Sequence, residues 1–230
     1  MINRIADISL RTAAKVAGFS RLISMIGIFG LFVLSSLIVP TNAETTANNI
    51  IANELLFRFG ISSLLIMFIL DVVMALALYV LLKPVNRSLS LLAAWFSLMH
   101  VAIAGGALVN HFSVLQLLSG ADYLTVFETG QLHAQVMLFL NSFDYGFLIG
   151  MVFFSLHLIV LGYLVFKSGY IPRILGVLLI IASLGYLIDS FGRFLLPNFD
   201  APILQFTGIG ELIFALWLVF KGAKIPEMKS

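Results

Sequence analysis

The sequence predicts an all-α, polytopic membrane protein with six transmembrane helices, and three observations predict it. Hydrophobic residues make up 61% of the 230 residues, charged residues make up 10%, and the mean hydropathy is +1.09, whereas a soluble domain is about half apolar. Six segments contain the roughly 20 apolar residues that a membrane-spanning helix needs. All six prolines fall at or between the ends of these segments, where the missing N–H breaks no helical hydrogen bond.

The expected spans follow one another with short connections. They are residues 17–39, 54–82, 89–112, 141–166, 171–193 and 203–220, within a transmembrane domain over 17–221. The apolar run from Leu22 to Val39 exceeds the about 7–15 residues of a signal-peptide core, so we interpret it as a span. Residues 1–16 predict a short cytoplasmic interfacial helix, and residues 222–230 a cytoplasmic tail. Residues 113–140 predict interfacial helices over the outer mouth, into which either neighbouring helix could also continue.

Lysine and arginine predict the orientation, because loops rich in them stay on the cytoplasmic side of a membrane. With the N-terminus inside, 11 of the 13 basic residues fall on that side, and both termini are cytoplasmic. Only Arg58 and Arg193 lie near the other face. The cytoplasmic group consists of Arg4, Arg11, Lys15, Arg21, Lys83, Arg87, Lys167, Arg173, Lys221, Lys224 and Lys229.

Composition and missing motifs exclude several classes of protein. The chain has no cysteine, which excludes disulfides, cysteine-ligated zinc and thiol catalysis. A formal net charge of +2 is too small to indicate nucleic-acid binding. The sequence lacks a phosphate loop, an H-E-x-x-H motif and a G-x-S-x-G motif. The partners that we expect are membrane lipids and a small solute, cation or lipid-like ligand.

An internal repeat predicts how the spans are organised. Residues Tyr163–Pro172 recur as Trp217–Pro226 at an offset of 54, and the segment Tyr79–Pro84 is a looser copy. The second, fourth and sixth spans therefore resemble one another, which predicts three pseudo-repeated helical hairpins. The alternative is that an aromatic residue and a lysine at each cytoplasmic boundary arose independently.

Four ionisable residues are expected near the membrane midplane. They are Asp71, His100, His157 and Glu211, and counting ~1.5 Å per residue places them about 14–16 Å from the cytoplasmic ends. An ionised side chain at that depth costs at least ~2.5–3.5 kcal/mol, so it normally faces the bundle interior and a partner. With no lysine or arginine expected at that depth, protonation, an imidazolium or a bound cation must accommodate the carboxylates. Hydrogen-bonded helix packing is the alternative interpretation.

A second, outer charged layer is expected roughly 27–36 Å from the inner ends. It consists of Arg58, His111, Asp144, Asp189 and Arg193. Glu54 with Arg58, and Asp189 with Arg193, are i,i+4 pairs, an arrangement typical of structural salt bridges on helices. His100 and His111 share a helix face, since they are eleven residues apart. We expect that face to line one polar cavity that joins the two layers.

The midplane residues also suggest possible cofactors. Asp71, His157 and Glu211, with His100, form a mixed nitrogen and oxygen ligand set that suits a divalent metal such as zinc, manganese or iron. A haem held by two imidazoles is less well supported, because only His100 and His157 lie at one depth. Single ligands on separate helices give no diagnostic spacing.

Several segments carry a resemblance to a known family. They are Phe57–Gly60, Asp71 with Ala75–Arg87, Leu118–Tyr123, Phe153–His157, Gly162–Val165, Ser168–Leu179, Gly185–Ser190 and Gly210–Leu212. On these residues, nearly the whole chain resembles the bacterial membrane family called domain of unknown function 4386. The resemblance implies a multi-pass protein of the bacterial cytoplasmic (inner) membrane with no settled activity. It also favours Asp71, His157 and Glu211 as the core of the site, since the family commonly has glutamine in place of His100.

The sequence leaves three hypotheses for function. The first is binding or proton-coupled transport of a small solute or cation at Asp71, His157 and Glu211, because midplane ionisable residues and internal repeats are typical of secondary transporters. The second is an intramembrane metal-dependent enzyme acting on a lipid-like substrate, with Arg58 or Arg193 binding an anionic head group. The third is a non-catalytic membrane partner or sensor subunit.

Overall fold

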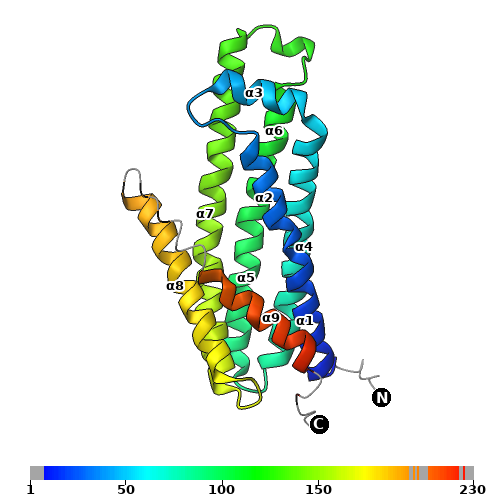
Figure 1. The fold of residues 1–230 in the computed structure, drawn as a ribbon, viewed down its shortest axis with the longest axis vertical. Coiled ribbons are helices and arrows are strands. Elements are labelled where there is room, and N and C mark those ends of the chain that lie inside the picture. Colours follow the sequence, from blue (N-terminus) through cyan, green and yellow to red (C-terminus); the bar gives the residue numbers. More distant parts are fainter. Residues whose placement is uncertain (1–7, 197–198, 200, 202–206, 223–224, 226–230) are drawn as a thin grey trace. The chain divides into compact units, whose positions relative to one another are not determined.

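The computed structural model describes residues 8–196, 199, 201, 207–222 and 225. Within these residues the regular structure is helical and contains no strand, which confirms the predicted all-α class (Figure 1). The chain divides into two compact units. Unit 1 comprises residues 1–23, 70–100 and 151–230, and unit 2 comprises residues 24–69 and 101–150.

The described helices agree in number and length with a multi-pass membrane protein. Five helical stretches are long and apolar enough to cross a membrane: Leu10–Ser36, Glu54–Leu82, Arg87–Leu117, Thr129–Lys167 and Arg173–Leu195. The elements are α1 (Leu10–Ser24), α2 (Ile26–Ser36), α3 (Ala43–Ala52), α4 (Glu54–Leu82), α5 (Arg87–Ala107), α6 (Val109–Leu117), η1 (Asp122–Leu124), α7 (Thr129–Lys167), α8 (Arg173–Leu195) and α9 (Ile209–Lys221). The sixth expected span starts among residues outside the described part, and its described portion is α9.

The first and third spans differ from the prediction because each is divided by a one-residue turn. The first begins at Leu10, within the segment expected to be interfacial, and Met25 separates α1 from α2. Residues 1–7 of that segment lie outside the described part. The third is divided at Leu108, whose carbonyl oxygen accepts a hydrogen bond from the N–H of His111 at 3.0 Å. This i+3 bond is the tighter turn typical of such a break.

The expected interfacial helices over residues 113–140 are mostly continuations of the spans. Helix α6 runs on to Leu117 and α7 begins at Thr129, so only η1 lies between them. Helix α3, by contrast, was not predicted. Its N-cap is Asn42, whose side chain accepts a hydrogen bond from the N–H of Thr45 at 2.9 Å, and Glu44 lies in its first turn. Both are ordinary signals of a helix N-terminus.

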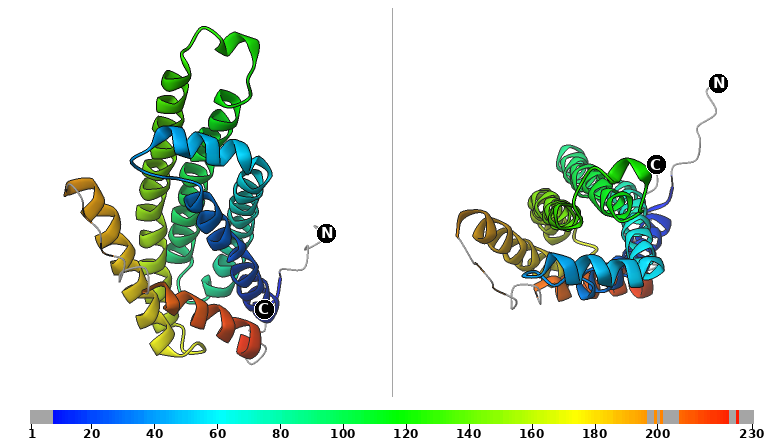
Figure 2. Two further views of the ribbon diagram at one scale, coloured as in Figure 1. Left: turned by 45° about the horizontal axis from the view of Figure 1, so that its top comes forward. Right: turned by 90° about the horizontal axis from the view of Figure 1, so that it is seen from above.

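Close helix crossings occur among the described residues of unit 1. A Cβ on Gly18 of α1 would lie 2.8 Å from the Val219 side chain and 2.9 Å from the Ala215 carbonyl oxygen, both on α9. A Cβ on Gly162 of α7 would similarly lie 2.7 Å from the Gly176 carbonyl oxygen of α8. Helices α8 and α9 are also neighbours (Figures 1 and 2). Small residues therefore bring α1 and α9 together although they are far apart in the sequence.

Unit 2 has its own apolar core and its own close crossing. Phe57, Leu64, Val114 and Val136 are fully buried in it. A Cβ on Gly30 of α2 would lie 2.8 Å from the carbonyl oxygen of Gly60 on α4. The same principle of small residues at a helix contact thus applies in both units.

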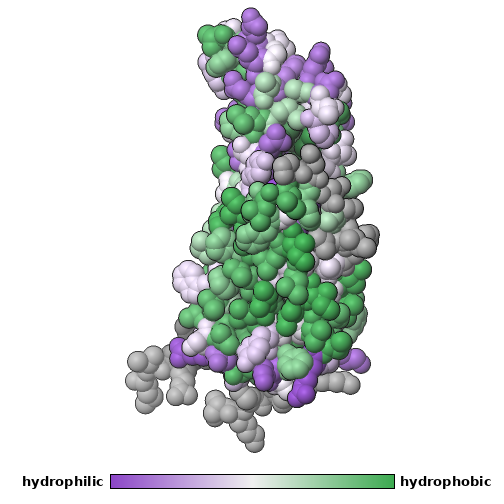
Figure 3. All heavy atoms as spheres, turned by 90° about the vertical axis from the view of Figure 1, so that its left-hand side faces the viewer, coloured by the Kyte–Doolittle hydropathy of each residue, from purple (hydrophilic) through white to green (hydrophobic). Residues whose placement is uncertain are grey.

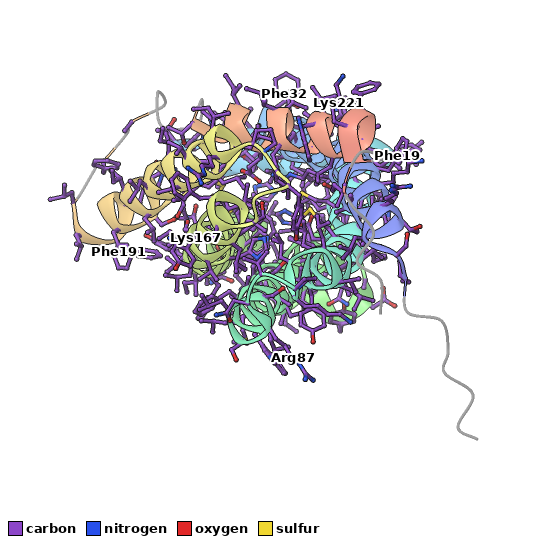
Figure 4. The ribbon with its side chains drawn as sticks, turned by 90° about the horizontal axis from the view of Figure 1, so that it is seen from below. Phe19, Phe32, Arg87, Lys167, Phe191 and Lys221 are labelled. Atoms are coloured by element: carbon purple, nitrogen blue, oxygen red, sulfur yellow. The ribbon has the colours of Figure 1, made fainter. Side chains whose placement is uncertain are left out.

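Large apolar side chains are exposed along the helices. Phe19 of α1 is 51% exposed and Phe191 of α8 is 47% exposed, and both lie at the outside of unit 1 (Figure 4). Hydrophobic residues also cover a broad area of the face drawn in Figure 3. Such a surface is unsuited to water and suited to lipid acyl chains. The exposed apolar residues and the five long helices define a membrane-embedded protein in contact with lipid.

Candidate functional site

An arginine lies between the two carboxylates that the sequence placed near the midplane. The Arg21 Nη2 donates to Glu211 Oε2 at 2.5 Å, and its Nη1 lies 3.8 Å from Asp71 Oδ1. The carboxylate side chains are only 6% and 3% exposed, while that of Arg21 is 22% exposed. Because all three belong to unit 1, the arrangement is a property of that unit alone.

The position of Arg21 corrects the sequence prediction. We expected Arg21 at the cytoplasmic side and no lysine or arginine at the depth of the carboxylates. The helix that carries it begins at Leu10 rather than Ala17, so Arg21 lies three turns into α1 instead of at its start. The signal that could have found it is the i, i+3, i+4, i+7 stripe Ala14, Ala17, Gly18 and Arg21, a small-residue face that ends in a charge.

Tyr186 completes what we call the ionic cluster, which consists of Arg21, Asp71, Tyr186 and Glu211. The Tyr186 hydroxyl of α8 donates to Glu211 Oε1 at 2.8 Å. Both oxygens of Glu211 therefore have a partner. Glu211 also lies in the first turn of α9, where the positive end of the helix dipole stabilises a carboxylate. Sequence reasoning missed Tyr186 because a tyrosine within an apolar helix is ordinarily a packing residue.

Asp71 is held less completely than Glu211. Its Oδ1 atom is buried and has no hydrogen-bond partner among the described residues, although it faces the Arg21 guanidinium at 3.8 Å. A buried acceptor in this state normally binds a proton donor or a cation. Within the cluster, the Asp71 carboxylate is therefore the group with binding capacity left over.

Phe154 of α7 lies among the polar groups of unit 1. Its ring centroid is 5.5 Å from the Arg21 guanidinium carbon and 5.0 Å from the centroid of His100. The rings of His157 and Tyr186 lie at 5.9 Å and 6.1 Å. An aromatic face attracts a nearby cation and excludes water, so Phe154 shields the guanidinium.

His157 is oriented by the backbone of another helix. Its Nδ1 lies 2.8 Å from the carbonyl oxygen of Ala93 on α5, and the residue is 1% exposed. His100 is also buried in unit 1, at 3% exposure. The structure thus places all four expected midplane residues, Asp71, His100, His157 and Glu211, in the interior of one unit.

A small cavity lies beside the ionic cluster. Arg21, Glu211 and His157 contribute its polar lining, and the remaining lining is apolar, from residues including Ala17, Phe154 and Leu218. Its volume is about 20 Å³, and about 10–15 Å³ measured in this way holds one water molecule. In this conformation the site has room for a water-sized group and not for an organic solute.

The residues expected to form the outer charged layer belong to different units. Arg58 pairs with Glu54 at 2.7 Å in unit 2, with both side chains more than half exposed. Arg193 pairs with Asp189 at 3.1 Å in unit 1. These are i,i+4 pairs of the kind that contribute little to stability. Asp144 is exposed in unit 2.

His111 is the exception in that layer, because it is buried in an aromatic environment. It is 2% exposed, and its ring centroid lies 4.0 Å from that of Phe143 and 5.5 Å from that of Phe57. These contacts lie within unit 2.

The expected metal ligands do not form a recognisable metal site. Across the described part of the chain, no three histidine, aspartate or glutamate side chains form a group that could hold a metal ion. The Arg21 guanidinium instead contacts both carboxylates. The arrangement is that of an ion-pair network, and the metal and haem hypotheses gain no support from it.

The fold and the buried charges define a class of protein, a multi-pass membrane protein with ionisable groups in its transmembrane helices. The chain belongs to the family described as a domain of unknown function, DUF4386, whose model matches residues 16–222. It is also similar to an uncharacterised protein of Archaeoglobus fulgidus, with 37% identity over 172 residues, which are 75% of this chain and 89% of the relative. No solved structure matches the chain.

Proposed function

We propose that this protein binds a proton or small cation at the ionic cluster and couples that binding to the movement of a small solute across the membrane. The observation that carries the proposal is the presence of two buried carboxylates around one guanidinium. With both carboxylates ionised, these three groups have a net charge of −1. Burial makes an uncompensated charge costly, so the cluster favours the uptake of one positive charge.

The unequal environments of the carboxylates indicate which one takes up that charge. Glu211 is held by Arg21 and Tyr186 at both oxygens, whereas Asp71 Oδ1 has only the 3.8 Å ion pair. Occupancy at Asp71 would weaken its attraction for Arg21, which in turn is bound to Glu211 of α9. Ion binding is thereby linked to the contact between α1 and α9, as alternating access requires.

The proposal includes a location and an orientation. The distribution of lysine and arginine supports insertion in the cytoplasmic membrane of a bacterium with both termini in the cytoplasm. Fusions of a reporter to residues in 118–128 and to either terminus test this arrangement. An external terminus would contradict it.

The test of function uses purified protein in proteoliposomes adsorbed to a solid-supported membrane. Proton, sodium or lithium gradients are combined with a panel of amino acids, sugars and organic cations. We expect at least one combination to produce charge movement that falls at least tenfold in Asp71→Asn. The control is Asp189→Asn, which removes a carboxylate from an i,i+4 helix pair and should leave the current unchanged.

Two outcomes would overturn the proposal. One is the absence of charge movement in every combination, together with a thermal stability whose pH dependence is the same in wild type and Asp71→Asn. The other is equal currents in wild type and Asp71→Asn. Either outcome would favour a purely structural cluster, as expected of a partner or sensor subunit.

A further inference from the structure

The hydrogen bond of His157 fixes where its ring carries a proton. A backbone carbonyl can only accept, so the 2.8 Å contact with Ala93 O requires hydrogen on Nδ1. In the neutral ring, Nε2 then carries a lone pair. This nitrogen is buried and has no hydrogen-bond partner among the described residues. The structure thus contains a pre-oriented basic atom that the proposed function has not yet used.

The free nitrogen belongs to the same site as the ionic cluster. His157 lines the cavity together with Arg21 and Glu211, and its Nδ1 edge is turned to α5. We therefore assign the opposite edge of the imidazole ring, which carries Nε2, to the cavity lining. A cavity of about 20 Å³ has room for one water molecule, and both His157 and Glu211 line it.

The donor atoms present suit a proton better than a metal ion. Calcium takes about 6–8 oxygen ligands, and magnesium demands six in a near-ideal octahedron. Here the oxygens of Glu211 are occupied by Arg21 and Tyr186, and the described residues offer no three-ligand group. A proton needs only one lone pair at each end of its path.

We infer that His157 Nε2 is the second acceptor of a proton that moves between the ionic cluster and the imidazole. This inference rests on the proposed function and names its coupling ion. In the forward step, the O–H bond of protonated Asp71 breaks, water in the site passes a proton on, and an N–H bond forms at Nε2 of His157. The products are a carboxylate and an imidazolium, and the water is regenerated.

The surroundings of His157 allow this step in both directions. Arg21 of α1 and Glu211 of α9 line the same cavity as His157. Asp71 of α4, His100 of α5 and Tyr186 of α8 belong to the same unit. Two carboxylates against one guanidinium leave a negative charge that compensates an imidazolium. The ring also stacks on Phe154, at 5.9 Å and 28°, on whose face a cation is stabilised.

The decisive variant is His157→Asn. The asparagine amide nitrogen can occupy the place of Nδ1 and keep the hydrogen bond to Ala93, but asparagine has no titratable atom in place of Nε2. We expect a thermal midpoint close to that of wild type and a proton-driven current reduced at least tenfold, within the range of about 10²–10⁴ for losing a positioned acid–base group. A wild-type current in this variant would overturn the inference and leave the proposed function standing.

A second readout is independent of transport. Protein labelled with ¹⁵N-histidine in nanodiscs gives imidazole signals, and His157→Asn identifies those of His157. We expect the Nδ1–H form at high pH and protonation at Nε2 as the pH falls. In Glu211→Gln, which removes a carboxylate from the cavity lining, that change should occur at a different pH from the wild-type one.

The two readouts separate the possible failures. No wild-type current, with His157 signals that respond to Glu211→Gln, would overturn the proposed function alone. His157 signals that do not change with pH, or that change identically in Glu211→Gln, would overturn the proton-acceptor role. A current driven by sodium and unaffected by the proton gradient would also overturn it.

Discussion

The prediction that tests the ionic cluster most directly is the effect of Arg21→Gln on stability. Two unit charges about 4 Å apart attract by about 4 kcal/mol at an effective dielectric constant of ~20, and Arg21 lies 3.8 Å from Asp71 and closer to Glu211. Desolvation offsets much of this attraction, and removing one partner of a buried pair costs about 3–5 kcal/mol. Because the Arg21 side chain keeps 22% exposure, we expect the lower value, about 3 kcal/mol.

The assay is thermal unfolding of detergent-purified protein. For a chain of 150–250 residues, 1 kcal/mol corresponds to about 2–4 °C, so Arg21→Gln should lower Tm by about 6–12 °C. Arg193→Gln is the matched control, since it breaks an i,i+4 helix pair whose contribution is about 0.3–0.5 kcal/mol. The double variant Arg21→Gln/Glu211→Gln should lose less than the sum of its single variants, by about 0.5–3 kcal/mol. Equal losses in Arg21→Gln and Arg193→Gln would refute the reasoning.

Three further perturbations test neighbouring contacts. Gly18→Ala should destabilise the protein by about 1–3 kcal/mol, because the added methyl group would collide with α9. Gly106→Ala is the control, since a methyl group there meets nothing within 4 Å. Equal Tm values for the two variants would contradict this prediction. Tyr186→Phe should cost about 1.5–3 kcal/mol in chemical denaturation, since it removes a hydrogen bond to the carboxylate of Glu211. Burial raises the pKa of Tyr170 to about 12, above its unfolded value of about 10. The contribution of the Tyr170 hydroxyl to the free energy of unfolding is therefore complete below about pH 10 and lost as the pH rises toward 12. In Tyr170→Phe, the free energy of unfolding measured against pH should change less between about pH 10 and pH 12.

Most of the fold could be predicted from the sequence, because lipid imposes a simple rule on composition and length. Apolar runs of about 20 residues identify spans, and all five candidate spans of the structure overlap expected ones. Helix ends were harder to predict. Residues 113–140 contain enough apolar side chains to extend α6 and α7 beyond the expected boundaries, and hydropathy alone does not distinguish a longer helix from an interfacial one.

The burial of Asp71, His100, His157 and Glu211 could be predicted, because ionisable residues within apolar spans have few alternatives to the interior. Arg21 could not be found in the same way, since basic residues near the start of a span ordinarily lie at the interface. Its actual depth depends on where α1 begins and on the Gly18 contact with α9, which is a tertiary effect. The outer layer shows the same limit, because His111 is buried against Phe143 while Arg58 and Glu54 are exposed.

The separation of Arg21 and Glu211 in the chain has a consequence for biosynthesis. They are 190 residues apart, and at about 5–20 residues per second a ribosome completes Glu211 roughly 10–40 s after Arg21. Asp71 follows Arg21 by 71 − 21 = 50 residues, so for most of that interval it is the acidic partner available to Arg21. Glu211 of α9 is therefore expected to join the ionic cluster only after Arg21 and Asp71 have been made.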